Sequence, residues 1–189
     1  SRYGRVLRSL LESGEDLDDW IIIYTSDHGD MLGEHGFWEK HSFFEGSAKV
    51  PLVIRWPRRF SGGRRVRENV NLCDLFATLC ELADLPTPGI LDSRSLVPLL
   101  EGGDSAWRDT TFSEIDGTAI MVKSKDLKYT WYGPDCPEEL FDLAADQTES
   151  QDLRHDSSRT NDLNHLRGLG DEFRNRCERR LGEFEGGLP

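Results

Sequence analysis

A short, unbroken apolar run near the start of the chain restricts its fold more than any other feature. The run reads Trp-Ile-Ile-Ile-Tyr-Thr over residues 20–25 and stops at Ser26-Asp27-His28-Gly29. β-Branched and aromatic residues without polar alternation are typical of a strand covered on both faces, as in the parallel sheets of α/β proteins. Ligand-binding groups in such sheets collect beyond the carboxyl ends of the strands. We therefore expect the Asp-His-Gly turn at such an end.

The segments around this strand predict an α/β domain. A second strand is expected over residues 50–56, and helical spacing of apolar residues predicts helices over 3–13 and 70–85 and a short helical turn near Leu96–Leu100. Residues 1–107 are therefore expected to form part of a mixed or parallel sheet flanked by helices. A strand so close to the start lacks neighbours, so an exposed apolar edge is expected, covered by another chain or copy.

The pattern changes after residue 107 to short strands joined by turn-forming dipeptides. Strands are predicted over residues 110–115, 118–124, 127–131 and 139–143. A polar tail follows, with a helix over about residues 161–184. Residues 108–189 thus predict a small four-stranded antiparallel sheet with a C-terminal helix.

The charge balance restricts the partners. The 189 residues include 35 acidic and 23 basic side chains, a formal charge of -12. Nucleic acid and anionic membrane surfaces attract basic proteins, so neither is expected as a general partner. A single basic group inside a pocket could still bind a small anionic substrate. No run of about 18 apolar residues is present, so no membrane span is expected.

The four cysteines favour a reducing compartment. Cys73, Cys80, Cys136 and Cys177 form no Cys-x-x-Cys pair. Cys73 and Cys80 are two helical turns apart on roughly one helix face, which favours buried, reduced thiols over a disulfide. This usage favours the cytoplasm.

Asp27 and His28 are candidate metal ligands. A carboxylate oxygen and an imidazole nitrogen suit Mn or Zn, and Ca or Mg accept the imidazole less readily. Gly29 is expected to let the backbone turn sharply behind them. The alternative is that Asp27 caps a helix while His28 is a surface residue, and the local pattern leaves both open.

The segment around these residues resembles the sulfatases of the alkaline phosphatase superfamily. The matching motifs are Ser26–Gly29, Leu32–Gly36, Lys40, Phe43–Ser47 and Lys49–Leu52, then Asp74–Ala83, and Glu139–Leu143 with Asp146 and Glu149. His28 after the aspartate, with Lys40 thirteen positions beyond Asp27, is most similar to the choline sulfatase and phosphonate monoester hydrolase branch. The resemblance spans about residues 1–153. It implies that residues 1–107 are the C-terminal portion of an alkaline-phosphatase-like mixed sheet flanked by helices.

The resemblance assigns roles to four residues. Asp27 and His28 would complete a site for a divalent metal (Ca, Mn or Zn), and Lys40 would hold sulfate or phosphate oxygens. His41 could protonate the leaving group or contact substrate; a packing or surface role is equally open for His41 and for His35. Phe43 and Phe44 could face a quaternary ammonium substrate, but core packing is the favoured interpretation.

The nucleophile of the resembled enzymes is missing from this sequence. It is a formylglycine made from Cys or Ser in a Cys/Ser-x-Pro/Ala-x-Arg motif, and none of the four cysteines has that context. Two further metal-binding aspartates are also absent. We therefore expect a fragment whose N-terminal half carries the nucleophile, and the isolated chain should be inactive.

Three functions remain open. The leading hypothesis is hydrolysis of a small sulfuric ester by the full-length protein, which is expected to be a homo-oligomer. The first alternative is hydrolysis of phosphonate monoesters or phosphodiesters at the same site, because sulfuryl and phosphoryl groups share shape and charge. The second is a catalytically silent assembly or binding module.

Overall fold

The computed structural model describes residues 2–89, 91–103 and 106–185, which fall into two compact units. The first unit comprises the segment that ends at Asp27, then Val50–Arg67 and the segment that starts at Cys73. The second comprises His28–Lys49, Glu68–Leu72 and the segment that starts at Ala106. The units interleave along the sequence, and the domain boundary predicted at residue 107 stays a prediction.

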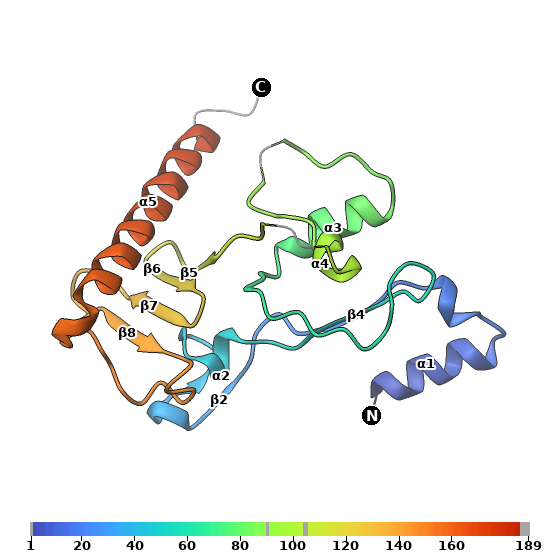
Figure 1. The fold of residues 1–189 in the computed structure, drawn as a ribbon, viewed down its shortest axis with the longest axis horizontal. Helices are drawn as coiled ribbons and strands as arrows, with labels where there is room; N and C mark the ends of the chain where they lie inside the picture. Colours follow the sequence, from blue (N-terminus) through green and yellow to red (C-terminus); the bar gives the residue numbers. More distant parts are fainter. Residues whose placement is uncertain (1, 90, 104–105, 186–189) are drawn as a thin grey trace. The chain divides into compact units, whose positions relative to one another are not determined.

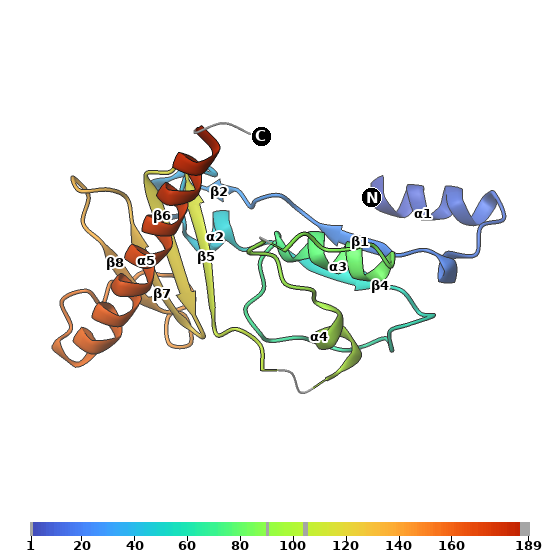
Figure 2. The ribbon, with the colours of Figure 1, turned by 90° about the horizontal axis from the view of Figure 1, so that it is seen from above.

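The first unit contains two strands and the helices predicted for this part of the chain. Its elements are α1 (Arg2–Glu12), η1 (Leu17–Asp19), β1 (Ile22–Thr25), β4 (Leu52–Arg55), α3 (Asp74–Leu82) and α4 (Val97–Glu101) (Figure 1). β1 and β4 lie side by side as an antiparallel pair (Figure 2). Ile54, Leu82 and Val97 belong to one apolar cluster, so α3 and α4 pack beside β4.

The β1–β4 pair differs from the doubly covered strands that the apolar run indicates. The two strands are antiparallel, which a mixed sheet permits and a parallel sheet does not. Tyr24 and Val53 lie directly opposite each other and are 46% and 57% exposed. Ile54 packs against the helices, whereas Tyr24 and Val53 on the other face are exposed to solvent. The apolar edge covered by another chain stays a prediction.

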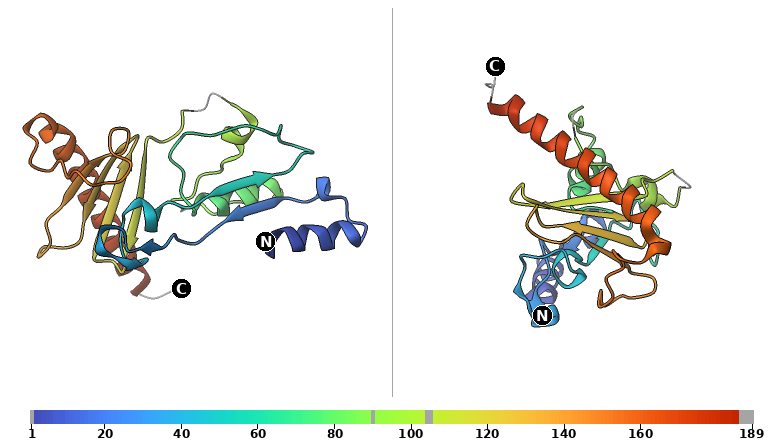
Figure 3. Two further views of the ribbon diagram at one scale, coloured as in Figure 1. Left: turned by 90° about the horizontal axis from the view of Figure 1, so that it is seen from below. Right: turned by 90° about the vertical axis from the view of Figure 1, so that its left-hand side faces the viewer.

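The second unit contains the predicted antiparallel sheet. Its strands are β5 (Thr110–Ile115), β6 (Ala119–Ser124), β7 (Leu127–Trp131) and β8 (Glu139–Asp142), in the order β5-β6-β7-β8. The hairpin between β5 and β6 turns at Asp116 and Gly117, with φ of 51° and 67°, the left-handed conformations that tight hairpins require. After η3 (Ser157–Arg159), helix α5 (Thr160–Glu185) crosses one face of the sheet (Figure 3).

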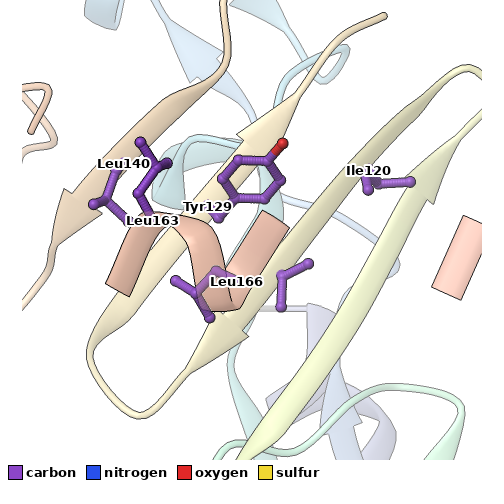
Figure 4. Close-up of a cluster of buried hydrophobic side chains, with 6 residues drawn as sticks. Ile120, Tyr129, Leu140, Leu163 and Leu166 are labelled. Atoms are coloured by element: carbon purple, nitrogen blue, oxygen red, sulfur yellow. The ribbon is translucent and has the colours of Figure 1, made fainter. Parts of the chain in front are cut away.

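The main core lies between α5 and the sheet. Leu163 and Leu166 of the helix meet Ile120, Tyr129 and Leu140 of three strands (Figure 4). A Cβ added to Gly170 would lie 2.7 Å from Ile120 Cδ1, so glycine at this position lets α5 approach the sheet closely.

The opposite face of the sheet carries the segment from His28 to Lys49. Side chains of consecutive strand residues point to opposite faces. Leu140 faces α5, whereas Phe141 joins Met31 and Phe44 in a separate cluster. The segment contains β2 (Met31–Leu32), η2 (Glu34–Gly36), β3 (Trp38–Glu39) and α2 (Glu45–Ala48). The sheet thus supports the segment that carries most of the predicted site.

Two sequence expectations concern the chain as a whole. Among the described helices, none is both long and apolar enough to cross a membrane. None of the four cysteines is in a disulfide, but only Cys80 of the predicted pair is buried. Cys73 is exposed and lies at the N-cap position of α3, just before that helix.

Candidate active site

The Asp-His-Gly turn follows directly from β1, as predicted. Asp27 is exposed, and its carboxylate accepts a hydrogen bond from the Ser26 hydroxyl at 3.4 Å. His28 is half-buried, and its Nδ1 lies 2.6 Å from the carbonyl oxygen of Gly29. Because a carbonyl oxygen can only accept, Nδ1 is the donor of this hydrogen bond. A histidine whose Nδ1 donates in this way ligates a metal through Nε2.

Gly29 is fixed by a close approach of two backbone segments. Its N–H donates to the carbonyl of Ser47 at 2.7 Å, and a Cβ at residue 29 would lie 2.0 Å from the carbonyl oxygen of Gly46. Its φ is not in the left-handed region, so the expected sharp turn is not what requires glycine here. The requirement is space for the α2 backbone.

Lys40 lies on a loop whose backbone is held in place. Its carbonyl accepts hydrogen bonds from the Ser47 hydroxyl at 2.5 Å and from the Ser42 N–H at 2.9 Å. Glu39, just before it, has a φ of 70°. This left-handed conformation costs free energy in a residue other than glycine and persists only where the surrounding structure holds it. The side chains of Lys40 and His41 are exposed. The backbone is therefore constrained while both side chains face solvent.

Ser47 joins the two predicted parts of the site. Its carbonyl binds the turn at Gly29, next to His28, and its hydroxyl binds the backbone of Lys40. The side chain of Ser47 is 2% exposed, so these bonds are shielded from water. The structure thus brings the histidine turn and the lysine loop to one residue, although they are separated in sequence.

Other residues singled out from the sequence have packing roles. Phe43 and Phe44 are 2% and 9% exposed and lie in apolar clusters, so the packing interpretation is confirmed. His35 stacks on Phe44, with ring centroids 3.9 Å apart. Two arginines are paired with acidic residues: Arg55 of β4 with Asp18 at 2.5 Å, and Arg59 with Glu101 at 2.8 Å, so acidic neighbours offset their charge.

The described residues do not assemble a metal site on their own. Within these ranges, no group of three or more His, Cys, Asp or Glu side chains is placed to hold a metal ion. Asp27 and His28 are consecutive, so their Cα atoms are about 3.8 Å apart. Tight binding of a divalent cation depends on more ligands than two.

Comparisons with known proteins place this chain in a family. The family model for the C-terminal region of N-sulphoglucosamine sulphohydrolase matches residues 33–174. The chain belongs to the sulfatase family. It corresponds to the C-terminal region of these members of the alkaline phosphatase superfamily, so the resemblance predicted from the motifs is confirmed.

Individual sulfatases and related hydrolases agree with this assignment. An arylsulfatase of Clostridium perfringens is 33% identical over 88% of this chain and 36% of its own length. A choline-sulfatase of Rhizobium meliloti is 39% identical over 72% of this chain and 27% of its own length. The crystal structure of a phosphonate monoester hydrolase of Agrobacterium radiobacter superposes with a TM-score of 0.74, at 32% identity, over 90% of this chain and 37% of that one. The chain therefore spans about a third of the length of the curated relatives it matches.

Sequence reasoning missed the residue that anchors the lysine loop of this sulfatase-family chain. Lys128 of β7 is fully buried, and its ammonium lies 2.8 Å from the carboxylate of Glu45. Burial alone would raise the pKa of Glu45, but Lys128, followed by Lys123 and Lys49, holds that pKa below its usual value. A structural role for Glu45 is expected from its place in an aromatic-acid-glycine turn, but a lysine within a strand gives no local sign of burial.

Proposed function

We propose that this chain is the C-terminal part of a sulfuric ester hydrolase, in which Asp27 and His28 hold a divalent metal and Lys40 binds the sulfate oxygens. The observation that carries the proposal is a pair of hydrogen bonds made by Ser47. Its carbonyl accepts from the turn beside His28, and its hydroxyl donates to the backbone carbonyl of Lys40. Membership of the sulfatase family supports it. The nucleophile, expected to be a formylglycine, would come from a part of the protein outside this chain.

The chemistry of the donor set fits a metal. Asp27 offers a carboxylate, and His28, whose Nδ1 donates to the Gly29 carbonyl, would ligate the metal through Nε2. These donors suit Mn or Zn and are compatible with Ca. A bound divalent cation would stabilise negative charge on the oxygens of the reacting ester.

Lys40 would contribute a second positive charge. Attack at sulfur places charge on the non-bridging oxygens, and an ammonium fixed beside them stabilises that charge in the transition state. The bonds from Ser47 and Ser42 to the Lys40 carbonyl hold the start of this side chain, so less ordering is needed when substrate binds. His41, exposed on the same loop, is proposed to contact substrate or to protonate the leaving group.

A phosphonate monoester is the second candidate substrate. The similarity to a phosphonate monoester hydrolase at 32% identity favours it specifically. Sulfuryl and phosphoryl groups are both tetrahedral and carry charge on oxygen, so Asp27, His28 and Lys40 would serve either reaction. The homo-oligomer and the cytoplasmic location expected from the sequence stay predictions.

The test measures hydrolysis of an aryl sulfate and of a phosphonate monoester by the full-length protein that contains this chain. Asp27→Ala, His28→Ala and Lys40→Ala should each lower kcat/KM by about 100-fold or more, and chelation of the metal should abolish activity. Lys49→Ala, another exposed lysine nearby, is the control. If the full-length protein hydrolyses neither ester, the silent-module hypothesis replaces the enzyme. If it is active and the three variants match the wild type, Asp27, His28 and Lys40 are structural residues.

A further inference from the structure

A fully buried lysine binds the loop that follows Lys40. Lys128 Nζ lies 2.8 Å from the carbonyl oxygen of Phe43, 2.8 Å from Glu45 Oε1 and 2.6 Å from Glu149 Oε1. An ammonium has three N–H donors, and here each has an acceptor. Two of the three acceptors belong to the loop, so Lys128 fixes both its backbone and a side chain.

Glu149 binds the same loop from the other side of the ammonium. Its Oε2 accepts a hydrogen bond from the backbone N–H of Glu45 at 2.6 Å, and its side chain is 2% exposed. Glu149 itself has a φ of 53°, and the preceding turn is held by Asp146, which accepts hydrogen bonds from Thr148, Ser150 and Gln151. The turn therefore presents the Glu149 carboxylate to the loop in one conformation.

The loop is a rigid link between the sheet and the proposed site. On the sheet side, Phe43 N–H donates to the Tyr132 hydroxyl at 2.8 Å, in addition to the bonds from Lys128 and Glu149. On the other side, Ser47 binds the backbone of Lys40 and of Gly29. Each link is a hydrogen bond to a loop held at both ends, so a displacement at Phe43–Glu45 would move Lys40.

Stability alone does not account for such a cluster. Charges lose their hydration when they are buried, and a buried ion pair often contributes no more stability than apolar residues of the same volume. A fully paired ammonium does define one geometry, because any shift of the loop would leave a charge unsatisfied. Burial of Lys128 between two carboxylates therefore points to placement of the loop.

We propose that Lys128 and Glu149 are positioning residues for Lys40. They hold residues 43–45 against the sheet, and the loop transmits that placement to the lysine proposed to bind the sulfate oxygens. The inference rests on the proposed function, because Lys128 and Glu149 would affect the reaction only by positioning Lys40.

The first experiment measures kcat and KM for an aryl sulfate in the full-length protein. Lys128→Met and Glu149→Gln should each lower kcat/KM by about 100-fold, the effect of a small misplacement of a binding group. Lys123→Met is the matched control, since Lys123 faces Lys128 across the strands and contacts Glu45 only at 3.4 and 3.5 Å. Its effect should stay below about fivefold. Equal losses in Lys123→Met and Lys128→Met would overturn the proposal.

A double-mutant cycle separates this proposal from the proposed function. When Lys40 is already alanine, Lys128→Met should cause little further loss, because the two residues act through one interaction. An undiminished further loss would show that Lys128 acts elsewhere. Full activity of Lys40→Ala alone would instead contradict the role of Lys40 in the proposed function.

Proteolysis gives a readout that does not depend on activity. Release of the loop should speed trypsin cleavage after Lys40 severalfold in Glu149→Gln, a variant of unchanged shape, while cleavage after Arg154 stays at the wild-type rate. Equal acceleration at both sites would indicate general unfolding, and unchanged cleavage after Lys40 would show that the loop is not held by Glu149. Either result would overturn the positioning role.

Discussion

The two compact units of the chain bury their apolar side chains to different extents. In the second unit, Val122 and Leu140 are 0% exposed, and both faces of the four-stranded sheet are covered by segments of the same unit. In the first unit, Tyr24, Val53 and Phe76 are 46%, 57% and 51% exposed. The sheet of the second unit therefore has a core on both faces, although Leu32 and Trp38, which precede Lys40, are each 71% exposed. The first unit presents apolar strand and helix surfaces of the kind that normally meet another protein segment.

Most residues of the proposed site belong to the second unit. The loop with Lys40 and the turn at His28 and Gly29 belong to the second unit, and Asp27 ends the first segment of the other unit. Preorganised charge requires groups held by a packed surround. The second unit holds the backbone of Lys40 through Ser47 and Ser42, while the side chain of Lys40 faces solvent.

The largest expected effect comes from equivalent truncations in the two units. Leu140→Ala removes a side chain that is 0% exposed and should lower the free energy of unfolding by about 3 kcal/mol. Val53→Ala, at a side chain that is 57% exposed, should change it by less than about 0.5 kcal/mol. Urea unfolding followed by circular dichroism measures both. Similar losses would mean that Val53 is covered in solution, for example by a second copy, and the contrast between the units would not hold.

A pair of glycines tests the contrast in the backbone. Gly29→Ala places a Cβ 2.0 Å from the Gly46 carbonyl oxygen, so the α2 backbone must shift, at a cost of about 2 kcal/mol. A Cβ at Gly62 of the first unit meets nothing within 4 Å, so Gly62→Ala should be neutral or slightly stabilising. The midpoint temperatures of thermal unfolding of the two variants and the wild type measure these two changes in stability. A tolerated alanine at residue 29 would show that the turn and α2 are not packed as the structure has them.

Much of the second unit could be predicted from the sequence because its signals are local. Asp116-Gly117 defines a hairpin, and the predicted strands 110–115 and 127–131 agree with β5 and β7. Lys128 could not be predicted as buried, because its partners Glu149 and Phe43 are 21 and 85 positions away and only the folded sheet brings them together. The same holds for the antiparallel pairing of β1 with β4, since an apolar run does not specify its neighbour.

The candidate site divides in the same way. The Asp-His-Gly turn and Lys40 are visible as motifs, because their residue types carry the chemistry. Their connection through Ser47 is not visible, because a serine hydroxyl that binds a backbone carbonyl leaves no pattern in the sequence. Asp146 and Glu149 are visible in the sequence as parts of a motif. Only the contacts show that Asp146 closes a turn and that Glu149 is a buried acceptor for Lys128 and for the Glu45 N–H.

The smallest expected effect is a pH dependence confined to the turn that presents Glu149. The Thr148 hydroxyl, then the N–H groups of Gln151 and Ser150, lower the pKa of Asp146 to about 2. Because this pKa lies below its ordinary value of 3.8, the carboxylate stabilises the folded chain fully above about pH 4. That contribution is lost as the pH falls toward 2. Asp146→Asn should therefore unfold more easily than the wild type at pH 6, and the difference should shrink in acid.

The cause of this shift can be tested directly by NMR titration of the Asp146 carboxyl. Thr148→Val removes the hydroxyl that lowers its pKa most and should move the pKa upward, toward 3.8. An unchanged pKa in Thr148→Val would show that the turn is not closed by this hydrogen bond in solution. The turn would then not hold the Glu149 carboxylate in the one position from which it can fix the loop that carries Lys40. The close packing of the second unit would not include this turn.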